Sequence, residues 1–129
     1  MSYSKKEYIK YRLEKAEETY NASKLLADNA LWSSSINRLY YACFYAVNAL
    51  LYKTNIKAQT HTGIKNQFSL HFIKTNKIDK KYGKLYSNLF NWRQKGDYSD
   101  FFDFDEETVK SLIYPVQEFI DIIKKIFKA

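Results

Sequence analysis

Apolar side chains recur at steps of three and four residues along most of this chain, the spacing of one face of an α-helix. The first such stretch covers residues 5–29, and Ser4 followed by Glu7 fits a capping box at its start. The last stretch can be capped by Asp103 or Asp105 and runs almost to the end of the chain, with Pro115 inside it. The pattern therefore predicts a long amphipathic helix at each end.

Residues 33–52 hold the longest apolar run, and here two stripes lie side by side. The first is apolar and is made of Ile36, Leu39 or Tyr40, Cys43, Val47, Leu50 and Leu51. The second is polar and aromatic and is made of Arg38, Tyr41, Tyr45, Asn48 and Tyr52. A helix with so little solvated surface is expected at the centre of a fold, and one of the serines at positions 33, 34 and 35 is expected to cap it.

Two further helices are predicted between these. A shorter one follows the segment Thr60-His61-Thr62-Gly63, where a threonine hydroxyl is available as a cap, and ends near Thr75. Another runs from a cap at Asp79 to about Lys95, where residues 96–100 break the pattern. Three glycines and one proline are too few for an all-β fold, which needs frequent turns. The fold class predicted is all-α, an up-and-down helical bundle of four long helices plus one short helix, in a single domain over residues 1–129.

The composition indicates a cellular location and shows an uneven distribution of charge. The single cysteine, Cys43, lies in the apolar run, which favours a reducing, cytoplasmic location. The longest nearly uncharged run, residues 39–52, has 14 residues, whereas a membrane span needs about 20, so no membrane association is expected. The net charge is +7, and residues 53–95 carry ten Lys or Arg and one acid. This segment could attract nucleotide or RNA phosphates, or it could be a solvated lysine-rich surface.

Metal and cofactor chemistry is not expected. The two histidines, His61 and His71, are ten residues apart, and no pair of His, Cys or Glu has metal-ligand spacing. The glycines are isolated, so no glycine-rich loop can cradle a phosphate.

Two arginines in aromatic surroundings are the candidates for binding. Arg38 lies in the polar stripe with Tyr41 and Tyr45, where it can bind phosphate or pair with an acid such as Asp97. Arg93 stands near the end of the fourth predicted helix.

The surroundings of Arg93 also allow two interpretations. With Lys95 it can contact phosphate, while Trp92 or Tyr98 stacks on a base. The structural alternative is that Arg93 pairs with Asp97 one helical turn further on.

Several of these features together resemble the HEPN domain family. The carriers of the resemblance are residues 37–51, NRLYYACFYAVNALL, then THTG at 60–63, then Phe68 and Phe72, then Arg93 with Asp97 and Tyr98, and EFI at 118–120. The resemblance spans nearly the whole chain and is to the small, stand-alone prokaryotic branch associated with nucleotidyltransferases. It implies a helical bundle, commonly a homodimer, with a minimal nucleotidyltransferase as its partner protein in a toxin–antitoxin-like module.

Many HEPN proteins are metal-independent endoribonucleases whose motif is an arginine, a polar residue and a histidine four to six residues after the arginine. Histidine can move the proton of the 2′-OH, and arginine can stabilise the phosphorane charge. Arg93 matches the motif arginine, but the positions four, five and six residues further on are Asp97, Tyr98 and Ser99. The motif histidine is absent, and the sequence leaves open whether the chain is an enzyme.

Three hypotheses follow. In the first, the chain is the binding partner of a nucleotidyltransferase and binds nucleotide or RNA through Arg38, Tyr41, Tyr45, Arg93 and Lys95. In the second, it is a metal-independent endoribonuclease, a toxin, with Arg93, Asp97 and Tyr98 as its catalytic residues. In the third, it binds nucleotide or RNA without a catalytic partner.

Overall fold

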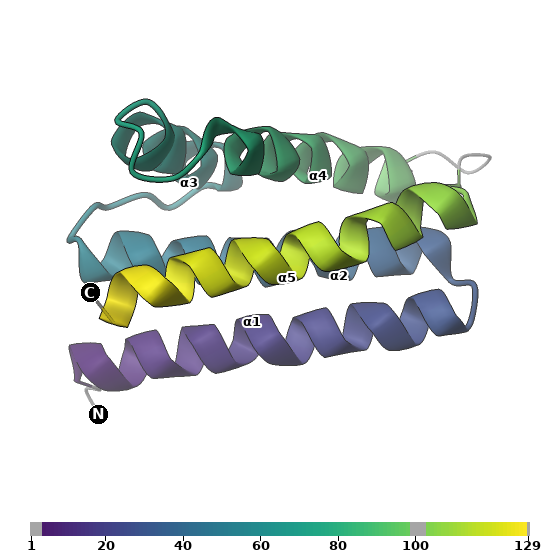
Figure 1. The fold of residues 1–129 in the computed structure, drawn as a ribbon, viewed down its shortest axis with the longest axis horizontal. Helices are drawn as coiled ribbons and strands as arrows, with labels where there is room; N and C mark the ends of the chain where they lie inside the picture. Colours follow the sequence, from purple (N-terminus) through teal and green to yellow (C-terminus); the bar gives the residue numbers. More distant parts are fainter. Residues whose placement is uncertain (1–3, 99–102, 129) are drawn as a thin grey trace.

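The computed structural model describes residues 4–98 and 103–128, with the side chains of residues 94–98 left out. Within these ranges the chain forms five α-helices and no strand (Figure 1). Their bounds are α1 (Lys5–Asp28), α2 (Trp32–Lys53), α3 (His61–Phe68), α4 (Lys80–Tyr98) and α5 (Glu106–Lys128), and a single π-helical segment, η1 (Ser69–Ile73), continues α3. The all-α class, with four long helices and one short helix, is confirmed.

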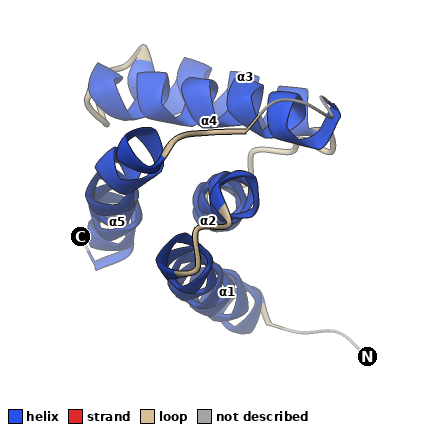
Figure 2. Ribbon diagram, turned by 90° about the vertical axis from the view of Figure 1, so that its right-hand side faces the viewer, coloured by secondary structure: helices blue, strands red, loops and turns tan. Residues whose placement is uncertain are grey.

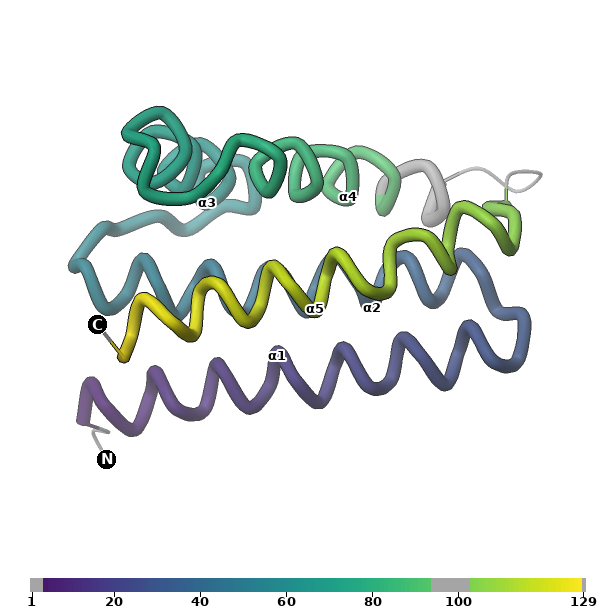
Figure 3. Tube along the Cα trace, viewed as in Figure 1, coloured from purple at the N-terminus to yellow at the C-terminus, as the bar shows by residue number. Residues whose placement is uncertain are grey.

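The four long helices run alternately in opposite directions, as the tube in Figure 3 shows. Helix α2 packs against α1, α3, α4 and α5, so it is the central helix that its sequence predicts. Figure 2 shows α1, α2 and α5 nearly end-on, with α3 running across the bundle above them.

The helix starts are set largely by short polar side chains. Hydroxyl or carboxylate oxygens accept hydrogen bonds from the first turns of α1, α3, α4 and α5, and the accepting residues are Ser4, Thr60, Asp79 and Asp105. These four predicted caps are confirmed, and each satisfies a backbone N–H that has no partner within its helix.

The predicted cap of α2 is wrong. The helix begins at Trp32, and its N-cap residue, Leu31, makes no side-chain capping hydrogen bond. Instead an oxygen of Asp103 accepts from the Ser33 backbone N–H at 3.0 Å and from its hydroxyl at 2.6 Å. The start of α2 is thus capped from a segment 70 residues away, which spacing along the chain cannot indicate.

The predicted end of α4 is also wrong. The helix continues through Gly96 and Asp97 to Tyr98 instead of ending near Lys95. A glycine inside a helix costs only about 1 kcal/mol relative to alanine, so packing of α4 can outweigh this local signal. The helix predicted to end near Thr75 instead changes to the π-helical segment η1 after Phe68.

The core is aromatic where four helices meet. Tyr40 of α2 stacks on Tyr86 of α4, with ring centroids 5.8 Å apart and ring planes 4° from parallel. Phe68 and Phe119 also lie against Tyr86, and all four rings are at most 1% exposed. The apolar stripe of α2 is buried as predicted. In the part of the chain that the structure describes, no helix is both long and apolar enough to cross a membrane.

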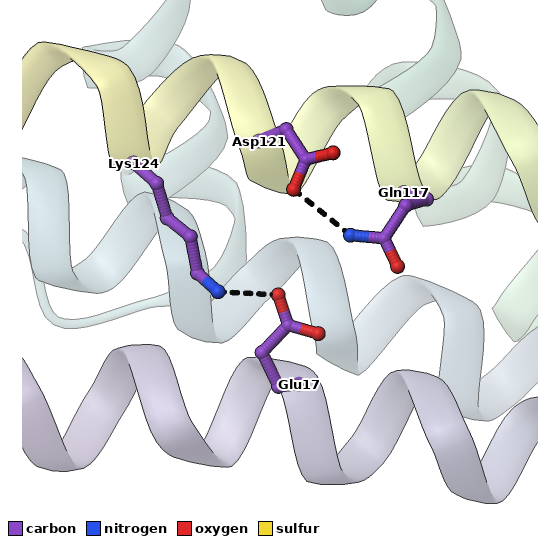
Figure 4. Close-up of polar contacts among 4 residues, drawn as sticks. All are labelled: Glu17, Gln117, Asp121 and Lys124. Carbon is purple, nitrogen blue, oxygen red and sulfur yellow. Dashed lines mark hydrogen bonds and ion pairs between the residues drawn. The ribbon is translucent and has the colours of Figure 1, made fainter.

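Polar contacts join α1 to α5 on another side of the bundle. Figure 4 shows Lys124 of α5 reaching Glu17 of α1, with a nitrogen–oxygen distance of 2.5 Å. On α5 itself, Gln117 donates a hydrogen bond to Asp121 at 2.9 Å. Both side chains of the ion pair are about one-third exposed, so the pair contributes at most about 1 kcal/mol and mainly orients α5 on α1.

Candidate functional site

The centre of the site is the guanidinium group of Arg93, which α4 holds against α2. Its central carbon lies 4.7 Å from the ring centroid of Tyr40 and 5.9 Å from that of Phe90. One terminal nitrogen donates a hydrogen bond to the Tyr41 hydroxyl at 3.1 Å. Among the described residues, Nε is buried and has no hydrogen-bond partner. Within the described residues the group is therefore held by ring faces and one hydroxyl, and its Nε–H has no protein acceptor there.

Tyr41 lies between two arginines. The guanidinium carbon of Arg38 is 4.9 Å from the Tyr41 ring centroid, while Arg93 binds the hydroxyl of the same side chain. Arg38 also donates two hydrogen bonds to the side-chain oxygen of Asn37, at 2.8 and 3.1 Å. Within the described residues, Arg38 is thus bonded to a neutral amide, and none of the ion pairs found there includes it.

Tyr45 extends this surface toward α1. Its ring lies 6.1 Å from the ring of Tyr41, and the guanidinium carbon of Arg12 lies 5.6 Å from its centroid. The fold therefore brings together four of the predicted binding residues, Arg38, Tyr41, Tyr45 and Arg93. The side chains of Lys95, Asp97 and Tyr98, and with them the proposed Arg93–Asp97 and Arg38–Asp97 pairs, lie outside the described residues.

The structure adds a residue to which the sequence assigns no role. His61 is the first residue of α3, and its Nδ1 lies 2.8 Å from the Tyr40 hydroxyl oxygen. The imidazole stacks on Phe44, with ring centroids 4.5 Å apart, and its centroid is 5.9 Å from that of Tyr41. In the sequence, His61 is marked by its position directly after the capping residue Thr60 and by the THTG segment of the family resemblance. Both indicate the first turn of α3 but do not say what that turn faces.

Burial and positive charge set the protonation of this cluster. Partial burial, and secondly the charge of Arg93, lower the pKa of His61 below 6.5, so its imidazole is neutral at pH 7. Burial raises the pKa of Tyr40 to about 12 despite the opposing effect of Arg93, so its hydroxyl keeps its proton. The cluster thus offers a fixed cation beside a neutral imidazole.

Among the described residues, no three His, Cys, Asp or Glu side chains come together in a way that could hold a metal ion. The chemistry that these residues support is therefore that of a cation, aromatic rings, hydroxyls and one imidazole. Such a set suits a phosphate ester whose neighbouring bases can stack on tyrosine.

The fold and this cluster define a small helical-bundle protein with an arginine–aromatic site between α2, α3 and α4. The family model of the HEPN domain matches residues 9–126, and the chain belongs to the HEPN domain family. It is 38% identical over 124 residues to a UPF0332 protein of Thermotoga maritima, covering 96% of this chain and 94% of that protein.

Two relatives from Methanocaldococcus jannaschii carry a functional name. The protein named "Putative toxin MJ0605" is 36% identical over 123 residues, covering 95% of this chain and 91% of the relative. The one named "Putative toxin MJ0142" is 32% identical over 113 residues, covering 88% of this chain and 77% of the relative. The resemblance read from the sequence is confirmed at the level of the family.

Proposed function

We propose that this chain is the toxin-like member of a two-protein module in the cytoplasm, that it forms a homodimer, and that it binds RNA with Arg93 on a backbone phosphate. The observation that carries the binding proposal is the Arg93 guanidinium, which is held on Tyr40 and Tyr41 and forms no ion pair with any described carboxylate. Holding the cation on ring faces reduces the side-chain freedom that phosphate binding would otherwise remove.

The surroundings of Arg93 favour RNA over a free nucleotide. Arg38 and Arg12 lie along the same tyrosine surface, so successive phosphates can each meet a cation while bases stack on Tyr41 and Tyr45. Among the basic residues of positions 53–95, Lys65 of α3 lies over the ring of Phe90, which also contacts Arg93. A mononucleotide would use only one part of this arrangement.

Binding to an unstructured, fluorescently labelled RNA tests the proposal. We expect Arg93→Gln to raise Kd at least about tenfold, because a charge-assisted hydrogen bond contributes about 1.5–3 kcal/mol. The logarithm of the association constant falls as the logarithm of the salt concentration rises, and the steepness of this fall should decrease by about 0.7, the value for one phosphate contact on a single strand.

The matched control is Lys24→Gln, which removes one charge and one cation–ring contact, the one to Tyr20 on α1. Its Kd should stay within about twofold of wild type. Equal weakening by both variants, or an affinity that does not change with salt, would contradict a phosphate site at Arg93. Competition by AMP at micromolar concentration would show that a nucleotide, and not RNA, is the ligand.

The partner that we propose is a minimal nucleotidyltransferase. Support comes from membership of the HEPN family and from the two relatives named as toxins, since a toxin requires a neutralising partner. We expect a short protein encoded beside this gene, with a Gly-Ser-x-x-x-Gly motif and paired Asp residues, to co-purify with the tagged chain. Separate elution of the two co-expressed proteins in gel filtration would contradict the pairing.

A second candidate function, metal-independent RNA cleavage, is favoured by one specific observation. His61, which lies outside the family's motif, is held next to the motif arginine through Tyr40.

A further inference from the structure

His61 and Arg93 share two neighbours although they are 32 positions apart in the chain. The Tyr40 hydroxyl binds Nδ1 of His61, and the guanidinium of Arg93 lies over the ring of the same tyrosine. Tyr41 places its ring beside the imidazole and its hydroxyl against Arg93. Helices α2, α3 and α4 therefore hold an imidazole and a guanidinium around one pair of tyrosines.

The imidazole is oriented as a proton-transfer group needs to be. Its face is fixed on Phe44 and its Nδ1 on the Tyr40 hydroxyl, while Nε2 makes no hydrogen bond to any described residue. His61 is only partly buried, so its free edge is within reach of a ligand. When Nδ1–H donates to the Tyr40 oxygen, Nε2 carries the lone pair that accepts a proton. Tyr40 is thus a positioning residue that fixes the orientation of the ring.

The charges around His61 suit a base. The described titratable groups packed near it are Tyr40 and Tyr41 from α2 and Arg93 from α4, with Lys65 one turn along α3 and turned toward Phe90. No described carboxylate forms an ion pair with His61, and the lowered pKa keeps the imidazole neutral near pH 7. A neutral imidazole can take a proton at the pH at which the protein works.

We propose that His61 is the proton-transfer residue of a metal-independent RNA cleavage in this chain, taking the place of the absent motif histidine. The proposal rests on RNA binding at Arg93. Nε2 takes the proton of a 2′-OH, the 2′-oxygen bonds to the adjacent phosphorus, and the bond from phosphorus to the 5′-oxygen breaks. The proton passes from the imidazolium through water to the departing 5′-oxygen, which leaves a 2′,3′-cyclic phosphate and a 5′-OH. Arg93 stabilises the charge on the phosphorane oxygens.

The test is cleavage of an end-labelled, unstructured RNA by the full-length protein in EDTA, with RNA affinity measured on the same preparations. We expect His61→Gln to lower the cleavage rate at least about 100-fold, the usual contribution of a general base. Its Kd for RNA should stay within about twofold of wild type.

The matched control is His71→Gln. His71 hydrogen-bonds Gln67 within its own helical segment, so its replacement should leave cleavage unchanged. The wild-type rate should rise with pH to a plateau, with a midpoint below 6.5, and the product should carry a 2′,3′-cyclic phosphate. An RNA with a single 2′-deoxy position should bind but not be cut there.

The outcomes separate the two proposals. RNA bound but not cleaved by wild type, or cleaved equally by His61→Gln, overturns the role of His61 and leaves RNA binding intact. No RNA binding by wild type overturns the proposed function and this role with it. If circular dichroism shows that His61→Gln is unfolded, His61→Asn and the wild-type pH profile decide, and a rate independent of pH between 5 and 8 counts against His61.

Discussion

At the scale of single residues, Tyr41 and Tyr40 determine what the two cations and the imidazole can do. Tyr41 uses its ring for Arg38 and its hydroxyl for Arg93, so one side chain positions both arginines. Tyr40 uses its ring for Arg93 and its hydroxyl for His61. Tyrosine can serve two partners in this way because its ring face and its hydroxyl are separate interaction sites.

The pKa of His61 gives a prediction at this scale. In wild-type protein the NMR titration midpoint of its imidazole should lie below 6.5, because burial and the charge of Arg93 both disfavour the imidazolium. In Arg93→Gln the midpoint should move upward, since the charge is gone while the burial persists. An unchanged midpoint would show that Arg93 and His61 do not interact electrostatically.

The same shift predicts how His61 affects stability. Its pKa is lower in the folded than in the unfolded chain, so as pH falls below about 6.5 the unfolded chain binds the proton first. The stabilisation is therefore fully present above pH 6.5 and is lost as pH falls through the folded pKa.

At the scale of elements, α2 depends on a cap that comes from the other end of the chain. Asp103, just before α5, accepts two hydrogen bonds from Ser33 in the first turn of α2. The contact therefore also holds the start of α5 next to the start of α2.

We expect Asp103→Ala to lower the free energy of unfolding by about 1 kcal/mol, the usual cost of losing a cap. Ser34→Ala is the control, because Ser34 is exposed at the same helix start and was one of the predicted caps. Its effect should be within about 0.5 kcal/mol. Urea unfolding of both variants measures this, and a larger loss in Ser34→Ala than in Asp103→Ala would contradict the assignment.

Periodicity and local caps predict most elements of this fold because the information for them is local. Ser4, Thr60, Asp79 and Asp105 act within one turn of their own positions, and the sequence places them correctly. Asp103 acts over 70 residues, and α4 continues through Gly96, which a local signal predicts as a break. Where tertiary contacts override local preference, single-sequence reasoning misplaces the boundary.

The residues of the candidate site also divide into those that the sequence indicates and one whose role depends on tertiary contacts. Arg38, Tyr41, Tyr45 and Arg93 stand out because cations among aromatic residues are visible in the sequence. The role of His61 depends on α3 crossing the bundle, which brings His61 to Tyr40 and Phe44. The spacing of residues along the chain does not predict this orientation of α3.

At the scale of the whole molecule, we expect two copies of the chain to associate. Tyr11 is 55% exposed and Tyr52 is 43% exposed, and both lie at the α1–α2 side, where Tyr8 and Tyr52 pack ring to ring at 4.4 Å. Aromatic side chains are enriched at protein interfaces. Sedimentation equilibrium at micromolar concentration should give the mass of two chains, and a mass of 15.4 kDa would contradict the dimer.

Cys43 is buried at the centre of α2, so the reactivity of its thiol measures how often the bundle opens. Its side chain is fully enclosed, and burial raises the pKa of the thiol, so a thiol reagent cannot react while the bundle is closed. Because Cys43 is the chain's only cysteine, the labelling rate in native buffer measures how often the central helix becomes exposed. RNA or a partner protein that binds only the closed bundle should slow this labelling in proportion to its occupancy, so the reactivity of one buried side chain reveals binding at the surface of the bundle.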